Sequence, residues 1–205
     1  MSDKFTTIDE QASYAVGRQM GGQLAAQPFD GMEINAVLEG IRDSLEGNES
    51  QVSEDKLKAA ITDLNERMMR KQEEQAGAQS AQGDAFLAEN AERAEVQITE
   101  SGLQYEVLSE GDGDKPAASS TVKVHYHGTL IDGTVFDSSV DRGESIEFPV
   151  NGVIAGWTEA LQLMNTGAKW KLYIPHNLAY GANGAGGMIG PYAALIFEVE
   201  LLEVK

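Results

Sequence analysis

Hydrophobic and polar residues follow two different periods along this chain, and the change comes near residue 95. Before that point apolar residues recur every three or four positions, which places them on one face of a helix. Beyond it they alternate with polar residues one by one, as in a strand that buries one face. The pattern therefore predicts a helical first half and a β-rich second half.

The first half begins with two expected helices. Thr7 and Glu10 match a capping box, in which each side chain satisfies a backbone donor at the start of a helix. We expect the first helix over about residues 8–25. A second apolar stripe starts at Ile34 and ends before Gly47, a residue that readily takes the left-handed conformation beyond a helix end.

A third helix is expected after Ser53, which can cap it. Its apolar stripe stops at Arg70, but helix-forming Gln, Glu and Ala continue. We expect one helix over residues 53–95, roughly 65 Å long at 1.5 Å per residue, with half of its length exposed as a stalk. A flexible linker beyond Arg70 is the alternative, because Gly77 and Gly83 each weaken a helix by up to ~1 kcal/mol relative to alanine. The apolar stripe consists of Leu57, Ile61, Leu64 and Met68.

The expected domain boundaries follow from these patterns. Residues 1–70 form a helical dimerisation domain, residues 71–95 continue the long stalk helix, and residues 96–205 form a second folded domain. Three helices with so little apolar surface make a poor core on their own, so we expect a second copy of the chain to complete the first domain. Gly17 and Gly21 lie four apart, a spacing that would allow another helix to approach closely. Incidental placement of these glycines is the alternative.

The second half predicts a curled sheet. Val122, Val124 and Tyr126 alternate with polar residues, and Asp132-Gly133 supplies a hairpin turn. One-sided strands of this kind are typical of antiparallel sheets. We therefore expect an α+β fold, in which an antiparallel sheet curled around one short helix is preceded by an all-α domain with a long stalk helix. The remaining apolar faces are Trp170, Leu172 and Ile174, then Leu195, Phe197, Val199 and Leu201, and on the short helix Trp157, Ala160, Leu161 and Met164.

Composition and charge narrow the classes of partner. The 205 residues allow one or two domains, and 33 acidic against 15 basic residues give a net charge of -18. This excess of acid argues against nucleic acid and anionic lipid as partners. The chain has no cysteine, and no apolar stretch is long enough to span a membrane. The first residues lack the pattern of a secretory signal, so we expect a cytoplasmic protein.

Several enzyme classes can be weighed against the residues present. His125 and His127 share a strand face without an obvious third ligand, so we expect solvent-facing histidines and no metal site. The glycine-rich run at 181–190 lacks the Lys-Ser/Thr ending of a phosphate-binding loop and predicts a flexible flap. Ser138 and Ser139 have no evident histidine partner, which argues against a nucleophilic triad. No cofactor is expected.

The second half also carries aromatic and apolar residues that suit a pocket. A carboxylate and two phenols lie among these residues, and such polar groups are costly to bury in a core without partners. Their presence therefore favours a shallow dry cavity that takes a small apolar group. The alternative, that these residues are core aromatics only, stays open on spacing alone. The set comprises Tyr126, Phe136, Asp137, Val153, Ile154, Trp157 and Tyr180.

Four separated motifs carry a resemblance to a known family. They are VHYHGTLIDGTVFDSS from Val124, GVIAGW from Gly152, AYG from Ala179 and ALIFEVELLEV from Ala194. In this order they closely resemble the FKBP family of peptidyl-prolyl isomerases, the immunophilins that bind tacrolimus, over essentially all of residues 100–205. The helical first half is similar to that of the bacterial macrophage infectivity potentiators, V-shaped homodimers joined through their N-terminal helices. Without a signal, the chain resembles the cytoplasmic branch.

The resemblance implies a function and a set of residues. The function is peptidyl-prolyl cis-trans isomerisation by residues 96–205, acting on proline-containing peptides and unfolded proteins, with client capture by the dimer. A non-catalytic chaperone or client-binding module is the alternative. Tacrolimus or rapamycin-type inhibitors are the expected small ligands. The implied catalytic residues are Phe136, Asp137, Trp157 and Tyr180. The implied binding residues are Tyr126, Arg142, Ile146, Phe148, Val153, Ile154, Met188, Ile189 and Phe197.

Some positions depart from the commonest family pattern. Ile146 and Met188 stand in place of a Phe and an Ile, and Ala185 replaces a histidine of the flap. Gly190 stands where a proline pair usually begins. These departures bear on inhibitor affinity and on the rigidity of the flap more than on activity.

The implied reaction suits a dry pocket. Rotation about an X-Pro bond faces a barrier of ~18–20 kcal/mol because it interrupts amide resonance. The twisted state separates less charge than the planar amide, so an apolar site favours it without an acid, a base or a metal. Trp157 would be the floor of the pocket and Tyr180 would donate a hydrogen bond to a substrate carbonyl. Asp137 would orient the site through a contact with Arg142 or Tyr126.

Overall fold

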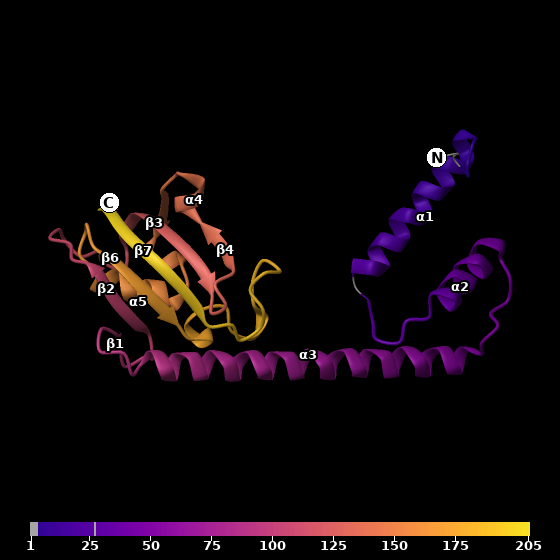
Figure 1. Cartoon of the computed structure of the whole chain (residues 1–205), viewed down its shortest axis with the longest axis horizontal. Coiled ribbons are helices and arrows are strands. Elements are labelled where there is room, and N and C mark those ends of the chain that lie inside the picture. Colours follow the sequence, from indigo (N-terminus) through magenta and orange to yellow (C-terminus); the bar gives the residue numbers. More distant parts are fainter. Residues whose placement is uncertain (1–3, 27) are drawn as a thin grey trace. The chain divides into compact units, whose positions relative to one another are not determined.

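The computed structural model describes residues 4–26 and 28–205, and the chain divides into two compact units between Lys71 and Gln72. Three helices precede the sheet, and the third runs across the division (Figure 1). They are α1 (Ile8–Ala26), α2 (Ile34–Glu46) and α3 (Glu54–Asn90). None of the described helices is long and apolar enough to cross a membrane.

The ends of the first two helices follow the sequence signals. The backbone N–H of Glu10 donates to Thr7 Oγ1 at 3.2 Å, and the N–H of Thr7 donates to Glu10 Oε2 at 3.0 Å. This reciprocal pair is the predicted capping box. Gly47 ends α2 in the left-handed conformation, with φ of 71°, and its N–H donates to the carbonyl of Asp43. Both helix predictions are therefore confirmed to within one residue.

The first unit leaves its apolar side chains uncovered. Neither α1 nor α2 has a buried residue among those described, and nothing lies within 4 Å of a Cβ built on Gly17 or Gly21. Apolar side chains on a helix surface normally pack against another element. The exposed ones here are Ile8, Tyr14, Val16, Met20 and Leu24 of α1, Ile34, Leu38 and Leu45 of α2, and Leu57, Ile61, Met68 and Met69 of α3.

The third helix differs from its prediction in two ways. It is continuous through Gly77 and Gly83, but it ends at Asn90, five residues before the expected end. It is also no free stalk over its last turns, because Gly83, Leu87 and Asn90 are buried within the second unit. Leu87 packs in a small cluster with Tyr173 and Ala194.

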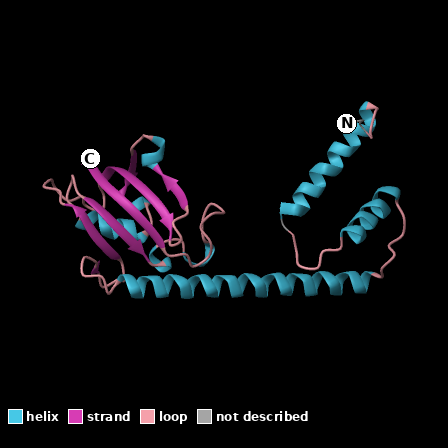
Figure 2. Ribbon diagram, viewed as in Figure 1, coloured by secondary structure: helices cyan, strands magenta, loops and turns pink. Residues whose placement is uncertain are grey.

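The second unit is a seven-stranded antiparallel sheet in the order β1-β2-β6-β7-β3-β4, with β5 also paired to β3 (Figure 2). The expected α+β class is confirmed. The strands are β1 (Gln97–Ile98), β2 (Gln104–Ser109), β3 (Thr121–Leu130), β4 (Val135–Ser138), β5 (Ile146–Pro149), β6 (Lys169–Ile174) and β7 (Leu195–Val204). Between them lie the short helices α4 (Ser139–Arg142), η1 (Val150–Gly152), α5 (Ala155–Leu163), η2 (His176–Leu178) and η3 (Gly181–Asn183).

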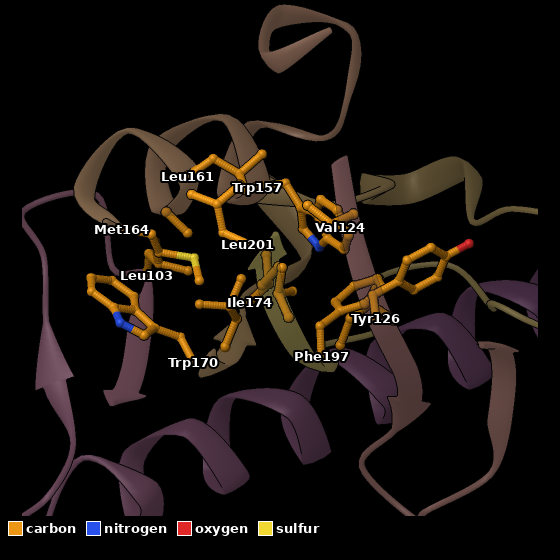
Figure 3. Close-up of a cluster of buried hydrophobic side chains, with 14 of the residues drawn as sticks. Leu103, Val124, Tyr126, Trp157, Leu161, Met164, Trp170, Ile174, Phe197 and Leu201 are labelled. Carbon is orange, nitrogen blue, oxygen red and sulfur yellow. The ribbon is translucent and has the colours of Figure 1, made fainter. Parts of the chain in front are cut away.

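One helix, α5, packs against the buried face of this sheet (Figure 3). The predicted alternation holds over most of both strands, since every second residue is buried from Val122 to Gly128 in β3 and from Leu195 to Leu201 in β7. Gly156 lets α5 approach β6 closely, because a Cβ there would lie 2.6 Å from Cγ2 of Ile174. The main core includes Leu103, Val122, Val124, Leu161, Met164, Leu172, Ile174, Leu195, Val199 and Leu201.

Tyr173 is the exception to the alternation. It lies on the face of β6 opposite the core, yet it is only 3% exposed. Phe86 and Leu87 of α3 cover it, with the Phe86 and Tyr173 ring centres 6.1 Å apart. The last turns of α3 therefore act as a second layer on the outer face of the sheet.

Candidate active site

A cavity of about 890 Å³ opens between the concave side of the sheet, α5 and the loop that follows η3. All the residues predicted for the site line it, together with Gly152, Ala185 and Gly186. The sheet contributes Tyr126, Phe136, Asp137, Ile146, Phe148 and Phe197, the helices and the segment before α5 contribute Arg142, Val153, Ile154 and Trp157, and the loops contribute Tyr180, Met188 and Ile189.

The floor of this cavity is Trp157, in the first turn of α5. Its ring meets three aromatic neighbours edge to face, with ring centres 5.4 Å from Tyr126, 5.2 Å from Phe197 and 5.9 Å from Phe148. Such T-shaped pairs are favoured by the quadrupoles of the rings. Trp157 is 4% exposed, and its indole N–H is buried without a partner among the described residues. The result is a rigid apolar surface with one unused donor.

Gly128 of β3 makes room for this aromatic arrangement. A Cβ at that position would lie 2.7 Å from the Phe136 ring and 2.8 Å from the Phe197 ring. These two rings stand edge to face with centres 5.3 Å apart. A glycine inside a strand often marks such a close approach, and this signal in the sequence was missed.

The polar side of the cavity is a closed triangle of Tyr126, Asp137 and Arg142. The Tyr126 hydroxyl donates to one carboxylate oxygen of Asp137, and Arg142 forms a salt bridge with the other. Arg142 Nη2 also donates to the Tyr126 hydroxyl oxygen at 3.1 Å. Asp137 therefore contacts both residues that the sequence offered as alternatives, and each of its oxygens has a partner.

These contacts set the ionisation of the triangle. Burial by itself would raise the pKa of Asp137, but the hydrogen bonds from Tyr126 and Arg142 outweigh it and lower the pKa below its ordinary value. Burial, followed by the hydrogen bond to Asp137, raises the pKa of Tyr126. At neutral pH the site therefore holds a carboxylate, a neutral phenol and a guanidinium, none of which is poised to exchange a proton.

Hydrogen bonds to two serine hydroxyls hold the turn that carries Arg142. The Ser139 hydroxyl is fully buried and accepts from the backbone N–H of Tyr126 at 2.8 Å, where the β3–β4 ladder has ended. Ser138 caps α4 by accepting from the N–H of Asp141 at 3.1 Å. These hydroxyls fix the chain on both sides of Tyr126 and Asp137.

The histidines next to these serines correct one expectation. His125 Nδ1 lies 3.1 Å from Ser139 Oγ and His127 Nδ1 lies 2.9 Å from Ser138 Oγ, so both serines do have a histidine neighbour. Both histidines are half-buried rather than fully solvent-facing, and neither lines the cavity. Among the described residues no group of histidines and carboxylates could hold a metal ion.

The rim of the cavity is formed by Tyr180 and a glycine-rich loop. Tyr180 is 38% exposed, and its hydroxyl makes no hydrogen bond with the residues described. The loop folds back on itself, because Ala185 and Ile189 exchange both backbone hydrogen bonds, at 2.9 and 3.0 Å. Ile189 is buried against the core, whereas Met188 is 51% exposed. The rim thus combines a free phenol with a mixed apolar edge.

Comparisons with known proteins show the family of this chain. Residues 113–202 match the model of the FKBP-type peptidyl-prolyl cis-trans isomerase, and residues 9–107 match the domain amino terminal to FKBP-type peptidyl-prolyl isomerase. The FKBP-type 22 kDa peptidyl-prolyl cis-trans isomerase of Escherichia coli is 50% identical over 200 residues, covering 98% of this chain and 97% of that protein. The chain belongs to the FKBP family of peptidyl-prolyl cis-trans isomerases.

Two members of the FKBP family match this chain over both its helical part and its sheet. The crystal structure of FkpA from Escherichia coli matches with a TM-score of 0.76 and 35% identity, covering 98% of each chain. The outer membrane protein MIP of Legionella longbeachae is 40% identical over 204 residues, covering 98% of this chain and 87% of that protein. The resemblance to the macrophage infectivity potentiators is thereby confirmed, as is the isomerase class of this FKBP.

Proposed function

We propose that this FKBP isomerises X-Pro bonds in the cavity above Trp157 and so accelerates protein folding that is limited by proline. One observation carries the proposal: a rigid aromatic floor lies beside a carboxylate whose two oxygens are already bound. The proline ring would lie on Trp157, between Tyr126, Phe136 and Phe197.

Such a site would accelerate the reaction by removing the amide from water and not by transferring a proton. A twisted amide separates less charge than a planar one, so removal from water disfavours the planar ground state more than the twisted state. An acceleration of about 10⁵ corresponds to about 7 kcal/mol, which binding that is tighter in the twisted state can supply. Asp137 is a positioning residue here, because it acts through Tyr126 and Arg142.

Tyr180 would hold the substrate at the rim. Its hydroxyl has no partner among the described residues and is exposed at the mouth of the cavity. It would donate a hydrogen bond to a carbonyl of the peptide, while Ile189 and Val153 cover the apolar side chain before the proline. Proline-containing peptides, unfolded proteins and tacrolimus or rapamycin-type inhibitors are the proposed ligands of this one cavity. Ile146 and Met188 would set the affinity for the inhibitors.

We assign the helical unit to dimerisation and client capture. The apolar side chains of α1 and α2 are exposed in a single chain, which supports a second copy of the chain as their cover. A dimer would hold two cavities on one particle and raise the local concentration of a client chain. A non-catalytic role in client binding remains the second candidate, because the exposed apolar surface would serve it without the cavity.

The two tryptophans of the chain give a matched test of the cavity. Trp157 lines it, whereas Trp170 is 6% exposed and stacks on Tyr105 at 4.3 Å between ring centres, away from the cavity. We expect Trp157→Leu to lower kcat/KM for a short proline peptide at least about tenfold, about 1.4 kcal/mol. Trp170→Leu should lower stability but spare kcat/KM.

Asp137→Ala is the second variant of this test and should also reduce kcat/KM, because Tyr126 and Arg142 lose their shared partner. The readout is peptide isomerisation with the thermal midpoint measured alongside. If both Trp157→Leu and Asp137→Ala isomerise the peptide at the rate of the natural chain, the cavity is not the site.

Client capture is separated from isomerisation by comparing the full chain with residues 72–205, which form one compact unit. Equal activity on a short peptide, with slower refolding of a proline-limited protein by the fragment, supports capture by the helical unit. Equal refolding by both would remove capture from the function. Refolding assistance that survives in the full chain with Trp157→Leu would favour the non-catalytic alternative.

A further inference from the structure

The last turns of α3 lie against the segment 190–194, which joins the rim of the cavity to β7. A Cβ built on Gly83 would lie 3.2 Å from Cβ of Ala194 and 3.9 Å from the carbonyl oxygen of Tyr192. Gly83 is buried, so the helix backbone itself makes this contact. Glycine costs a helix up to ~1 kcal/mol relative to alanine, and here its small size permits the close approach.

A second contact lies one turn earlier in α3. A Cβ on Gly190 would lie 2.5 Å from Oε1 of Gln79 and 3.2 Å from its Nε2. The side-chain amide of Gln79 therefore rests directly on the backbone of Gly190. Gly190 follows Ile189, whose side chain lines the cavity.

The contacted segment also reaches Tyr180. The backbone N–H of Tyr192 donates to the carbonyl of Gly181 at 2.8 Å, next to Tyr180 in the chain. Tyr192 adopts φ of 58°, a conformation that non-glycine residues rarely take, and its ring stacks edge to face on His176 with centres 5.1 Å apart. One short segment thus connects both rim elements, and α3 packs on its outer side.

The end of α3 is fixed to the sheet independently of this segment. Gln104 of β2 donates from Nε2 to the carbonyl of Leu87 at 2.9 Å, which also accepts from the N–H of Ala91 at 3.0 Å. The side-chain oxygen of Gln104 accepts from Asn90 Nδ2 at 2.8 Å, and both of these side-chain bonds are buried. Arg93 donates to Asn90 at 3.0 Å and to the Tyr173 hydroxyl at 2.9 Å. These bonds join the end of α3 to β2 and β6 and hold it in place as a support.

We propose that α3 is a buttress of the cavity rim and that Gln79 and Gly83 are positioning residues for Ile189 and Tyr180. The inference rests on the site proposed above, because the rim matters only if substrate binds there. Catalysis depends on sub-ångström placement, since a displacement of about 1 Å can cost up to 10²-fold in rate. A change in the last turns of a helix that precedes the isomerase sheet would therefore alter the activity of the sheet's cavity.

The test compares the same substitution at two glycines of α3 in the full chain. Gly83→Leu places a side chain against Ala194, whereas a Cβ at the exposed position 77 meets nothing within 4 Å. Both changes improve helix propensity by a similar amount. We expect Gly83→Leu to lower kcat/KM on a proline peptide about tenfold, mostly through KM, and Gly77→Leu to leave kcat and KM unchanged. Gly83→Ala should restore most of the activity, because its contact is 3.2 Å and needs only a small shift.

Chemical shifts of the Ile189 methyl groups and the Tyr180 ring provide a second readout that needs no activity. They should move in Gly83→Leu and stay in place in Gly77→Leu. Identical shifts and identical kinetics in the two variants would overturn the buttress. If the natural chain fails to isomerise the peptide, the proposed function fails, while the chemical shifts still decide whether α3 supports the rim.

A milder pair of variants covers the case in which Gly83→Leu does not fold. Gln79→Ala removes the amide that rests on Gly190, and Gln82→Ala changes an exposed glutamine of the same helix. We expect Gln79→Ala to lower kcat/KM about threefold and to shift the Ile189 methyl resonances, with no change in Gln82→Ala. Equal behaviour of these two variants in both measurements would also overturn the proposal.

Discussion

The two units of this chain handle the same problem, the burial of apolar side chains, in opposite ways. In the second unit α5 and the sheet enclose a dense core, and Leu103, Leu161 and Leu195 have no exposed surface. In the first unit α1 and α2 bury no described residue, and Ile8 and Leu45 are more than four-fifths exposed. The second unit encloses its core within a single chain and is called the closed unit below. The first unit leaves its apolar side chains exposed and is called the open unit.

The helix α3 shows that the division between the units does not follow secondary structure. Its first turns belong to the open unit, and its last turns pack on Tyr173 and Ala194 as part of the closed one. A boundary placed at residue 96, where the periodicity changes, would cut through this packing. The compact isomerase unit begins instead within the helix, at Gln72.

The largest expected effect comes from moving this boundary. Fragment 96–205 loses the cover of Tyr173 and the partners of Gln104, whereas fragment 72–205 keeps both. Loss of a buried leucine contact typically costs about 2–5 kcal/mol, so the thermal midpoint of 96–205 should fall at least about 10 °C below that of 72–205. Calorimetry measures the difference. Equal midpoints would mean that α3 contributes nothing to the isomerase unit.

The open unit gives the next prediction. Leu38 and Leu45 are exposed apolar residues of α2. If a second copy of the chain covers them, Leu38→Glu with Leu45→Glu should raise the dimer dissociation constant at least about 100-fold, because each buried contact at an interface contributes about 1–2 kcal/mol. Sedimentation measures this constant, and Glu39→Gln on the same helix serves as the control. A natural chain that sediments as a monomer at micromolar concentration would remove the dimer from the proposal.

A smaller effect is expected inside the closed unit at Gly128. Gly128→Ala forces the Phe136 and Phe197 rings apart, since the added carbon would lie within 2.8 Å of both. Overpacking of this kind costs about 1–3 kcal/mol, and kcat/KM should fall roughly tenfold as the apolar walls move. Thr129→Ala, one residue along β3, is the control. Unchanged inhibitor binding in Gly128→Ala would show that these rings do not shape the cavity.

The smallest effect concerns pH. Burial raises the pKa of Asp137 less than the hydrogen bonds from Tyr126 and Arg142 lower it, so the folded value lies below the unfolded one. Its contribution to stability is therefore complete above the unfolded value of about 3.9 and is lost as the pH falls through the folded value. Thermal midpoints of the natural chain and Asp137→Asn should differ by a constant amount from about pH 5 to pH 8. They should converge at lower pH. A difference that changes near neutral pH would contradict this ionisation.

Much of the secondary structure in both units could be predicted from local patterns. The alternation of Val122, Val124 and Tyr126 identified the buried face of β3, because side chains of a strand point to opposite faces. The capping box at Thr7 and the glycine at position 47 located helix ends to within a residue, because both act through neighbouring backbone groups. Periodicity failed at Tyr173, whose burial depends on a helix that is distant in sequence.

The site also divides into features that local motifs predict and features that only the fold shows. Its residues could be named from motifs, but the contacts among them could not. Sequence reasoning left Asp137 with Arg142 or Tyr126 as alternatives, and the fold brings it to both. It also missed Gly128 and the structural role of Ser139, because each acts through a neighbour on another strand or turn.

The sequence by itself determined the class of the fold, the order of its elements and the family to which the chain belongs, because periodicity, capping and contiguous motifs are local properties. The tertiary structure alone decided how these pieces work together. It showed that α3 ends as part of the isomerase unit, that Gln79 and Gly83 lie on the rim segment, and that Tyr126, Asp137 and Arg142 satisfy one another. Such contacts depend on distances between residues far apart in the chain, and no local pattern encodes them.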